Sequence, residues 1–142
     1  MLVRAAALAL ALSLCSTAAL AADAVKSVPV HFAKGATGAT VKGAIKGYDS
    51  VEYLVVARSG QTLRTTLTGS SNAAINVYPP RGDAASGPQT EALALDTVYG
   101  KGRAIGSATL PADGEYRIQV YQPRAAARRG SVAKFSLKIE VR

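Results

Sequence analysis

The feature that most constrains the fold is an alternation of apolar and polar residues with a period of two. In the stretch KFSLKIEV, residues 134–141, every second side chain is apolar, from Phe135 to Val141. Related patterns recur at 28–32, 41–45, 51–58, 63–67, 75–79 and 115–120. Successive side chains of a strand point to opposite faces, so this period is typical of strands with one buried face. The pattern predicts about eight strands.

Turn signals separate these segments. In Leu110-Pro111-Ala112-Asp113-Gly114, proline fixes φ and glycine can take the positive φ needed to leave a turn. Strands joined by short turns predict an all-β fold, an antiparallel β-sandwich in a single domain. The segment 80–106 is rich in Gly, Ala, Ser and Pro. It is either a mobile surface loop or a loop that contains one short edge strand.

One segment before the last strand breaks the β pattern. In QPRAAARRGS, residues 122–131, Pro123 suits the first position of a helical turn, the alanines favour helix and Gly130 suits its end. We therefore expect a short helical turn or loop here. On such a turn Arg124 and Arg128 are four residues apart and share one face, while Arg129 points about a quarter-turn away.

The first 21 residues are organised as a secretory signal peptide. Arg4 provides a positive charge, residues 5–14 are uniformly apolar, and small residues lead to an Ala-x-Ala signal ending at Ala21. The apolar stretch is shorter than the roughly 20 residues that span a bilayer. We expect export, cleavage between Ala21 and Ala22, and a periplasmic mature domain of residues 22–142.

Removal of this segment leaves few groups for catalysis. It takes away Cys15, the only cysteine, and so excludes disulfides and thiolate sites. The single histidine, His31, falls on the polar side of the first expected strand. The sequence contains no nucleophile elbow, glycine-rich phosphate loop or metal-binding histidine pair. We therefore expect a protein that is not an enzyme and holds no cofactor or metal.

The charge of the chain directs attention to recognition. The net charge is +8, and loss of residues 1–21 removes only Arg4 from the charged residues, so the mature domain stays basic. Positive charge can attract anionic lipids, lipopolysaccharide, nucleic acid or an acidic cleft. Nucleic acid is disfavoured because the basic residues are spread along the chain and no nucleic-acid motif is present.

Three residues are the main candidates for a binding site. Tyr48 falls at the apex of a tight connection between two strands. It either caps the edge of the core or forms an exposed anchor, a residue type enriched with Arg at interface hot spots. Arg124 and Arg128 either belong to a solvated charged loop or present guanidinium groups that match carboxylates bidentately.

At these residues the chain resembles the bacterial periplasmic inhibitors of goose-type (g-type) lysozyme. The resemblance runs from about residue 28 to 142. It is carried by Val-x-Phe-x-Lys-Gly at 30–35, Ile-Lys-Gly-Tyr-Asp at 45–49, Gly-Gln at 60–61, Leu-Pro through Gly-x-Tyr at 110–116, and Gln-x-Arg-x-x-Ala-Arg at 122–128. The Ile-Lys-Gly-Tyr-Asp segment together with the spaced arginines makes the match specific.

The resemblance implies an eight-stranded sandwich that inserts Tyr48, Arg124 and Arg128 into the substrate cleft of a g-type lysozyme. It also implies a monomer that binds the enzyme 1:1 and protects peptidoglycan. Asp49, Gln122 and Arg129 are candidates for secondary contacts. The alternative is a periplasmic module that binds glycan or envelope directly through the same aromatic and basic residues. The sequence contains no Trp, so the domain would be a poor platform for stacking sugar rings.

Overall fold

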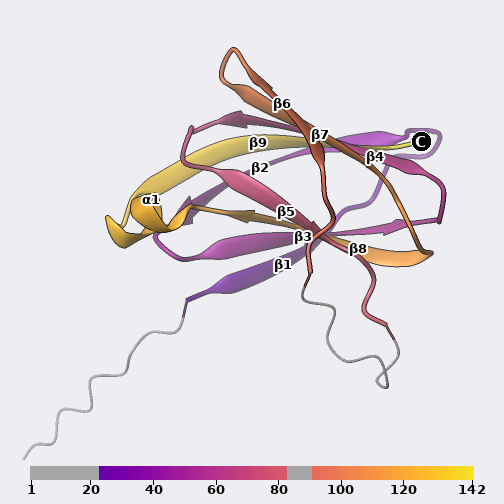
Figure 1. The fold of residues 1–142 in the computed structure, drawn as a ribbon, viewed down its shortest axis with the longest axis horizontal. Coiled ribbons are helices and arrows are strands. Elements are labelled where there is room, and N and C mark those ends of the chain that lie inside the picture. The colour runs from indigo at the N-terminus through magenta and orange to yellow at the C-terminus, as the bar shows by residue number, and fades with distance from the viewer. Residues whose placement is uncertain (1–22, 83–90) are drawn as a thin grey trace, which may run out of the picture.

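The structure, a computed structural model, describes residues 23–82 and 91–142. In chain order its elements are β1 (Val25–Pro29), β2 (Gly38–Lys46), β3 (Ser50–Ala57), β4 (Thr62–Gly69), β5 (Ala74–Tyr78), β6 (Asp96–Gly100), β7 (Arg103–Thr109), β8 (Gly114–Tyr121), α1 (Arg124–Arg128) and β9 (Val132–Val141) (Figure 1). The expected signal peptide, 1–21, lies outside the described residues. Within them, no helix has the length and hydropathy needed to cross a bilayer.

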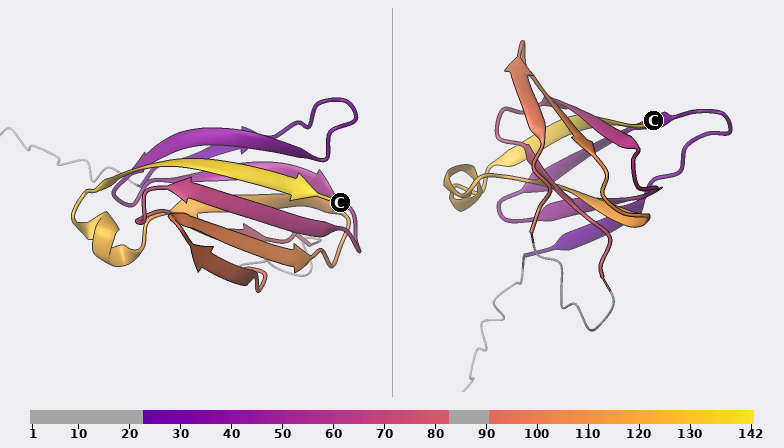
Figure 2. Two further views of the ribbon diagram at one scale, coloured as in Figure 1. Left: turned by 90° about the horizontal axis from the view of Figure 1, so that it is seen from above. Right: turned by 45° about the vertical axis from the view of Figure 1, so that its right-hand side comes forward.

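The strands form two sheets that pack face to face. One has the order β1-β3-β8-β5 and the other the order β2-β9-β4-β7-β6. Their stacking is visible from the side in Figure 2. The predicted β-sandwich is confirmed, with nine strands in the described residues where about eight were expected. Of the segment 80–106, residues 83–90 lie outside the described part. The rest contains β6 at the edge of its sheet, as one of the two alternatives expected, and also the start of β7, which was not expected.

The first strand differs from its prediction. β1 runs parallel to β3, with Val28 opposite Tyr53, whereas the expectation was antiparallel pairing. It also ends at Pro29, although the alternation extended to 32. The Val30 N–H still donates to the Leu54 carbonyl at 2.9 Å, but Phe32 leaves the sheet and packs against the core. Two parallel strands must be joined by a long connection, which here includes the whole of β2. The alternation of apolar and polar residues within one strand does not indicate which way that strand pairs.

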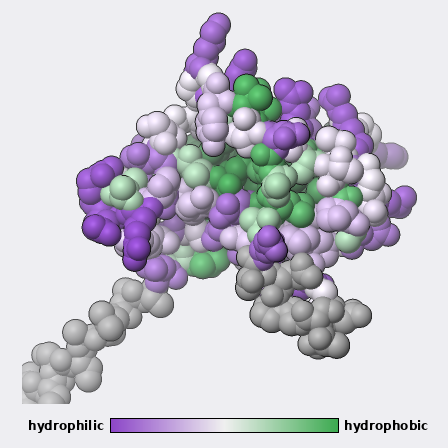
Figure 3. All heavy atoms as spheres, viewed as in Figure 1, coloured by the Kyte–Doolittle hydropathy of each residue, from purple (hydrophilic) through white to green (hydrophobic). Residues whose placement is uncertain are grey.

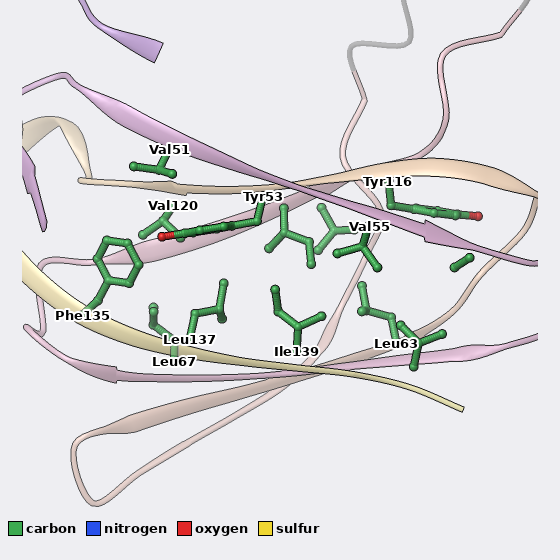
Figure 4. Close-up of a cluster of buried hydrophobic side chains, with 14 of the residues drawn as sticks. Val51, Tyr53, Val55, Leu63, Leu67, Tyr116, Val120, Phe135, Leu137 and Ile139 are labelled. Carbon is green, nitrogen blue, oxygen red and sulfur yellow. The ribbon is translucent and has the colours of Figure 1, made fainter. Parts of the chain in front are cut away.

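The core lies between the sheets and is formed by the apolar phase of the alternating strands (Figure 4). Leu137 and Ile139 of β9 are 0% exposed and face Tyr53 and Val55 of β3 across the sandwich. Full burial of such a side chain stabilises a fold by about 1.5–3 kcal/mol. The Tyr53 ring meets Phe135 edge to face, with centroids 6.3 Å apart. Burial raises the pKa of the Tyr53 hydroxyl.

Several connections meet at one end of the sandwich, called the α1 end below. The strand pairings place them there: Lys46 is opposite Val132, Gly69 is opposite Phe135, and Ala74 is opposite Tyr121. The connections at this end are the β2–β3 turn (47–49), the β4–β5 connection (70–73), the β6–β7 turn (101–102) and the β8–β9 connection that contains α1 (122–131). Residues far apart in sequence therefore share one rim.

Candidate functional site

The β2–β3 turn holds Tyr48 out from the α1 end. Gly47 has φ +58°, a conformation that costs glycine little and places the next residue at the tip. The Asp49 N–H donates to the Lys46 carbonyl at 3.0 Å and closes the turn. Tyr48 is 48% exposed, so half of a large aromatic surface is open to solvent. The sequence placed Tyr48 at the apex of this connection, and the structure agrees.

The helix α1 presents two arginines because its alanines are buried. Ala126 and Ala127 are 4% and 3% exposed and fix the helix against the sandwich. Arg124 and Arg128 are exposed, and their i, i+4 spacing puts them on one face with Cβ atoms about 5–6 Å apart. The Gly130 N–H donates to the Ala127 carbonyl at 2.9 Å and ends the helix. The short helical turn expected before the last strand is present.

The turn and the helix are joined through the backbone of Gly47. Its N–H donates to the Ser131 carbonyl at 2.9 Å. A Cβ added at Gly47 would lie 3.6 Å from the Ala127 carbonyl oxygen and 4.0 Å from the Gly130 Cα, so a side chain at this position would contact the end of α1. The residue before Tyr48 thus lies close to the residues that end the helix. The aromatic and one of the guanidinium groups project from adjoining loops at the α1 end.

Gln122 braces this junction and is not a surface residue. It is 5% exposed, and its Nε2 donates to the Ser131 carbonyl at 2.6 Å and to the Gly47 carbonyl at 3.3 Å. Its Oε1 accepts no hydrogen bond from the described part of the chain. The sequence suggested that Gln122 contacts a partner, but the free domain buries it. The sequence pattern does indicate this burial, because Gln122 follows Ile118 and Val120 at the same two-residue spacing and both of those side chains point into the core.

The other two secondary candidates differ in their surroundings. The Asp49 Oδ1 accepts a hydrogen bond from the Ala24 N–H at 3.0 Å, so its carboxylate ties the start of β1 to the turn. Arg129 is exposed and occupies the C-cap of α1, where its N–H donates to the Ala126 carbonyl at 3.1 Å. The structure therefore leaves the Arg129 side chain accessible and gives Asp49 a role within the domain.

The charge at the site is positive and not neutralised. In the part of the chain that is described, the ion pairs join Arg117 to Glu52, and Lys138 and Arg142 to Glu140. None of them involves Arg124 or Arg128. Hydrophilic residues gather over α1 at the left-hand end of the molecule in Figure 3. Free guanidinium groups on a short, packed helix can hydrogen-bond carboxylates without first breaking an internal ion pair.

A metal centre has no support in the described ranges. Across 23–82 and 91–142, no three His, Cys, Asp or Glu side chains come together in a group that could hold an ion. The arrangement at the α1 end offers an aromatic ring, guanidinium donors and the Asp49 carboxylate, which accepts a hydrogen bond from the Ala24 N–H. Exposed guanidinium groups can bind carboxylates, and an exposed ring can pack against a partner.

Known proteins are similar to this chain in sequence and in fold. No family model matches the chain. A curated protein of Escherichia coli (strain K12), "Inhibitor of g-type lysozyme", is 32% identical over 117 residues, which cover 82% of each chain. The crystal structure of Aeromonas hydrophila PliG, a periplasmic inhibitor of g-type lysozyme, has a TM-score of 0.73 and 44% identity, and covers 85% of this chain and 100% of that one. The crystal structure of Salmonella Typhimurium PliG, also a periplasmic inhibitor of g-type lysozyme, has a TM-score of 0.65 and 31% identity. It covers 82% of this chain and 98% of that one.

Proposed function

Because this chain belongs to the family of periplasmic inhibitors of g-type lysozyme, we propose that it binds such a lysozyme and blocks its substrate cleft with Tyr48, Arg124 and Arg128. The family consists of protein inhibitors and not enzymes. The proposal includes a monomeric domain of residues 22–142 that acts in the periplasm after loss of 1–21, forms a 1:1 complex and protects peptidoglycan from hydrolysis.

The observation that carries the proposal is the junction between the two loops. The hydrogen bond between Gly47 and Ser131, at 2.9 Å, holds an exposed aromatic residue next to an exposed cationic helix. The backbone of both loops is already in position, so the conformational entropy lost on association is confined to the exposed side chains. Val25 and Val132 add exposed apolar surface at the same end, with 59% and 54% of their surface accessible. Exposed apolar side chains gathered around polar anchors are typical of a protein interface.

The chemistry of a lysozyme cleft suits these groups. Lysozymes hydrolyse peptidoglycan with carboxylates in a groove shaped for sugar rings. The ring of Tyr48 is flat and amphipathic and can occupy a sugar subsite, while Arg124 and Arg128 can donate to the catalytic acids. Hydrogen bonds to charged groups contribute about 1.5–3 kcal/mol each. Two or three of them with a buried ring are consistent with nanomolar binding, about −12 kcal/mol.

The attraction must be local, because this domain is basic and many lysozymes are basic as well. At physiological ionic strength the Debye length is about 8 Å, so charges farther apart are largely screened. Contact between the arginines and carboxylates within the cleft then outweighs any repulsion between two cationic proteins. Long-range steering contributes little to the association rate under these conditions.

A lysis assay tests the proposed function directly. Purified residues 22–142 are titrated into suspensions of peptidoglycan with a g-type, a chicken-type or an invertebrate-type lysozyme. We expect stoichiometric loss of g-type activity. A pulldown on purified peptidoglycan without lysozyme separates the alternative, a glycan-binding module. Strong retention on peptidoglycan with no effect on lysis would contradict inhibition and favour that alternative.

Replacing Gln122 with alanine is expected to weaken inhibition indirectly. The substitution leaves Tyr48 unchanged but loosens the turn that positions it. The change removes the donor to the Gly47 and Ser131 carbonyls and loosens the junction, which then depends on the backbone hydrogen bond from Gly47 to Ser131. Loss of a buried hydrogen-bonding group lowers the free energy of unfolding by about 1–3 kcal/mol. Urea denaturation measures the stability, and a titration at a temperature where the variant is folded measures the inhibition constant.

Gln119→Ala is the matched control for this substitution. Gln119 lies three residues earlier, on β8, and its side chain forms hydrogen bonds of 3.4–3.5 Å to Asn76, Tyr78 and the Ser50 hydroxyl, none of them to Gly47 or Ser131. We expect Gln119→Ala to change stability and leave inhibition unchanged. Equal inhibition by folded Gln122→Ala and the native domain would show that the brace does not position the site.

A further inference from the structure

The residues assigned to the cleft are too few to form a whole interface. A stable protein complex buries about 800 Å² on each partner and involves about 20–30 residues a side. Tyr48, Arg124 and Arg128 with their immediate neighbours supply only a fraction of that number. The remaining contacts must come from elements that surround α1 on the same rim. A circular patch of this area is about 30 Å across.

The β6–β7 hairpin lies within that distance of the site. Arg103, at the start of β7, is opposite Thr68, and the next residue of β4, Gly69, is opposite Phe135 close to α1. β6 is three strands from β9 in the order β9-β4-β7-β6. Adjacent strands are about 4.8 Å apart, so β6 lies about 14 Å from β9 across the sheet. The hairpin stands at the top of the molecule in Figure 1 and forms a hydrophilic projection in Figure 3.

The hairpin exposes aromatic, aliphatic and basic side chains, which are suited to contact with a protein partner. Tyr99 is 79% exposed and Val98 is 68% exposed, although both belong to a regular strand. Lys101 and Arg103 are exposed at the tip, and no ion pair of the described residues involves them. Asp96, the acid of this hairpin, lies at the far end of β6 opposite Ser107. The tip therefore presents an aromatic ring and two cations with no acid beside them.

The tip has a fixed shape and a hollow beside it. Lys101 and Gly102 both have positive φ, +47° and +72°, as in the two-residue turns that match the twist of paired strands. A hollow of about 280 Å³ lies between the hairpin and the β4–β5 connection, lined by residues that include Tyr99, Arg103, Ser70 and Ser71. Leu67 and Ala73 also line the hollow, so it combines apolar surface with the two basic residues of the tip, Lys101 and Arg103.

We infer that the β6–β7 hairpin is a second lysozyme contact, which binds an acidic segment of the enzyme beside the substrate cleft. The inference rests on the proposed function and extends it. Charge argues for an acidic occupant because Lys101 and Arg103 are the charged groups at the tip. Position argues for the same lysozyme, since the hairpin and α1 share one rim. Tyr99 provides the apolar part of the contact, and Tyr48, Arg124 and Arg128 fill the cleft.

Single substitutions on the hairpin test the inference by equilibrium binding to g-type lysozyme. Tyr99→Ala and Arg103→Glu are each expected to raise Kd by about tenfold, the order found for interface tyrosines and arginines. The matched control is Arg58→Glu, the same charge reversal on an exposed arginine that follows β3 at the opposite end of the sandwich. It should change Kd by less than about twofold in 0.15 M salt, because the site lies beyond a Debye length.

The outcomes separate this inference from the proposed function. Native affinity of folded Tyr99→Ala and Arg103→Glu, together with loss of binding by an Arg124→Ala, Arg128→Ala variant, would overturn the hairpin contact and leave the proposed function intact. Failure of the native domain to bind any g-type lysozyme would overturn both. An equal loss for Arg103→Glu and Arg58→Glu would show that net charge, and not a local contact, determines affinity. Thermal unfolding verifies that each variant is folded.

Discussion

Alanine at both Arg124 and Arg128 is expected to weaken inhibition of g-type lysozyme by about 30- to 1000-fold, equivalent to about 2–4 kcal/mol. The two guanidinium groups share one face of α1 and are proposed to bind the acids of the cleft. Their loss leaves those acids free to act on substrate. An inhibition titration measures the effect, and isothermal calorimetry gives the change in Kd.

Stability should be almost unaffected by the same double substitution. Both arginines are exposed, and in the described residues neither forms an ion pair, so the free energy of unfolding should change by less than about 0.5 kcal/mol. Arg58→Ala with Arg64→Ala serves as the control, since it removes the same charge from the opposite end. Full inhibition by the folded Arg124, Arg128 variant would remove these residues from the site.

Alanine at Gly69 is expected to destabilise the fold by about 2–5 kcal/mol, the largest effect of a single methyl group in this domain. Gly69 has φ +110°, a conformation that costs other residues about 1–3 kcal/mol. An added Cβ would also lie 2.5 Å from the Lys134 carbonyl oxygen and 3.0 Å from the Phe135 Cα. Both are backbone atoms of β9, so relief requires a strand to shift, at about 1–3 kcal/mol.

Gly60→Ala separates the two contributions. Gly60 also has positive φ, +86°, but nothing lies within 4 Å of an added Cβ. It should show the conformational cost alone. Chemical denaturation of the two variants side by side gives the difference, which we attribute to the contact with β9. Equal stability of the two variants would mean that the strands yield without cost and that packing here is loose.

Sequence analysis predicted well the elements whose structure is indicated by residues within the element itself. β9 alternates without interruption from 134 to 141, and its apolar phase, including Leu137 and Ile139, is fully buried. The helix before it follows from the proline, alanines and glycine of 122–131. The β6 strand was harder, because all five of its residues are exposed and no buried phase marks it. The parallel pairing of β1 depends on a distant strand and leaves no local trace.

The candidate site residues could be proposed from the sequence, but their assembly could not. Tyr48 and Arg128 are 80 positions apart, and their loops are joined by the Gln122 side chain and by a backbone hydrogen bond from Gly47 to Ser131. No pattern of side chains specifies that bond. Gln122 was proposed as a secondary contact, but it is 5% exposed. Its position in the alternation, after Ile118 and Val120, is the feature of the sequence that indicates burial.

The anchoring of β1 bears on how the domain can be labelled or joined to other proteins. Ala24 is held to the β2–β3 turn by two hydrogen bonds, from its N–H to the Asp49 carboxylate and from the Ser50 N–H to its carbonyl. Polypeptide fused ahead of Ala24 therefore leaves the sandwich beside Tyr48. Arg142, by contrast, pairs with Thr62 at the far end, where the carboxyl terminus is marked in Figure 1. A purification tag or fluorophore belongs on the carboxyl side, clear of the surface that we propose to bind the enzyme.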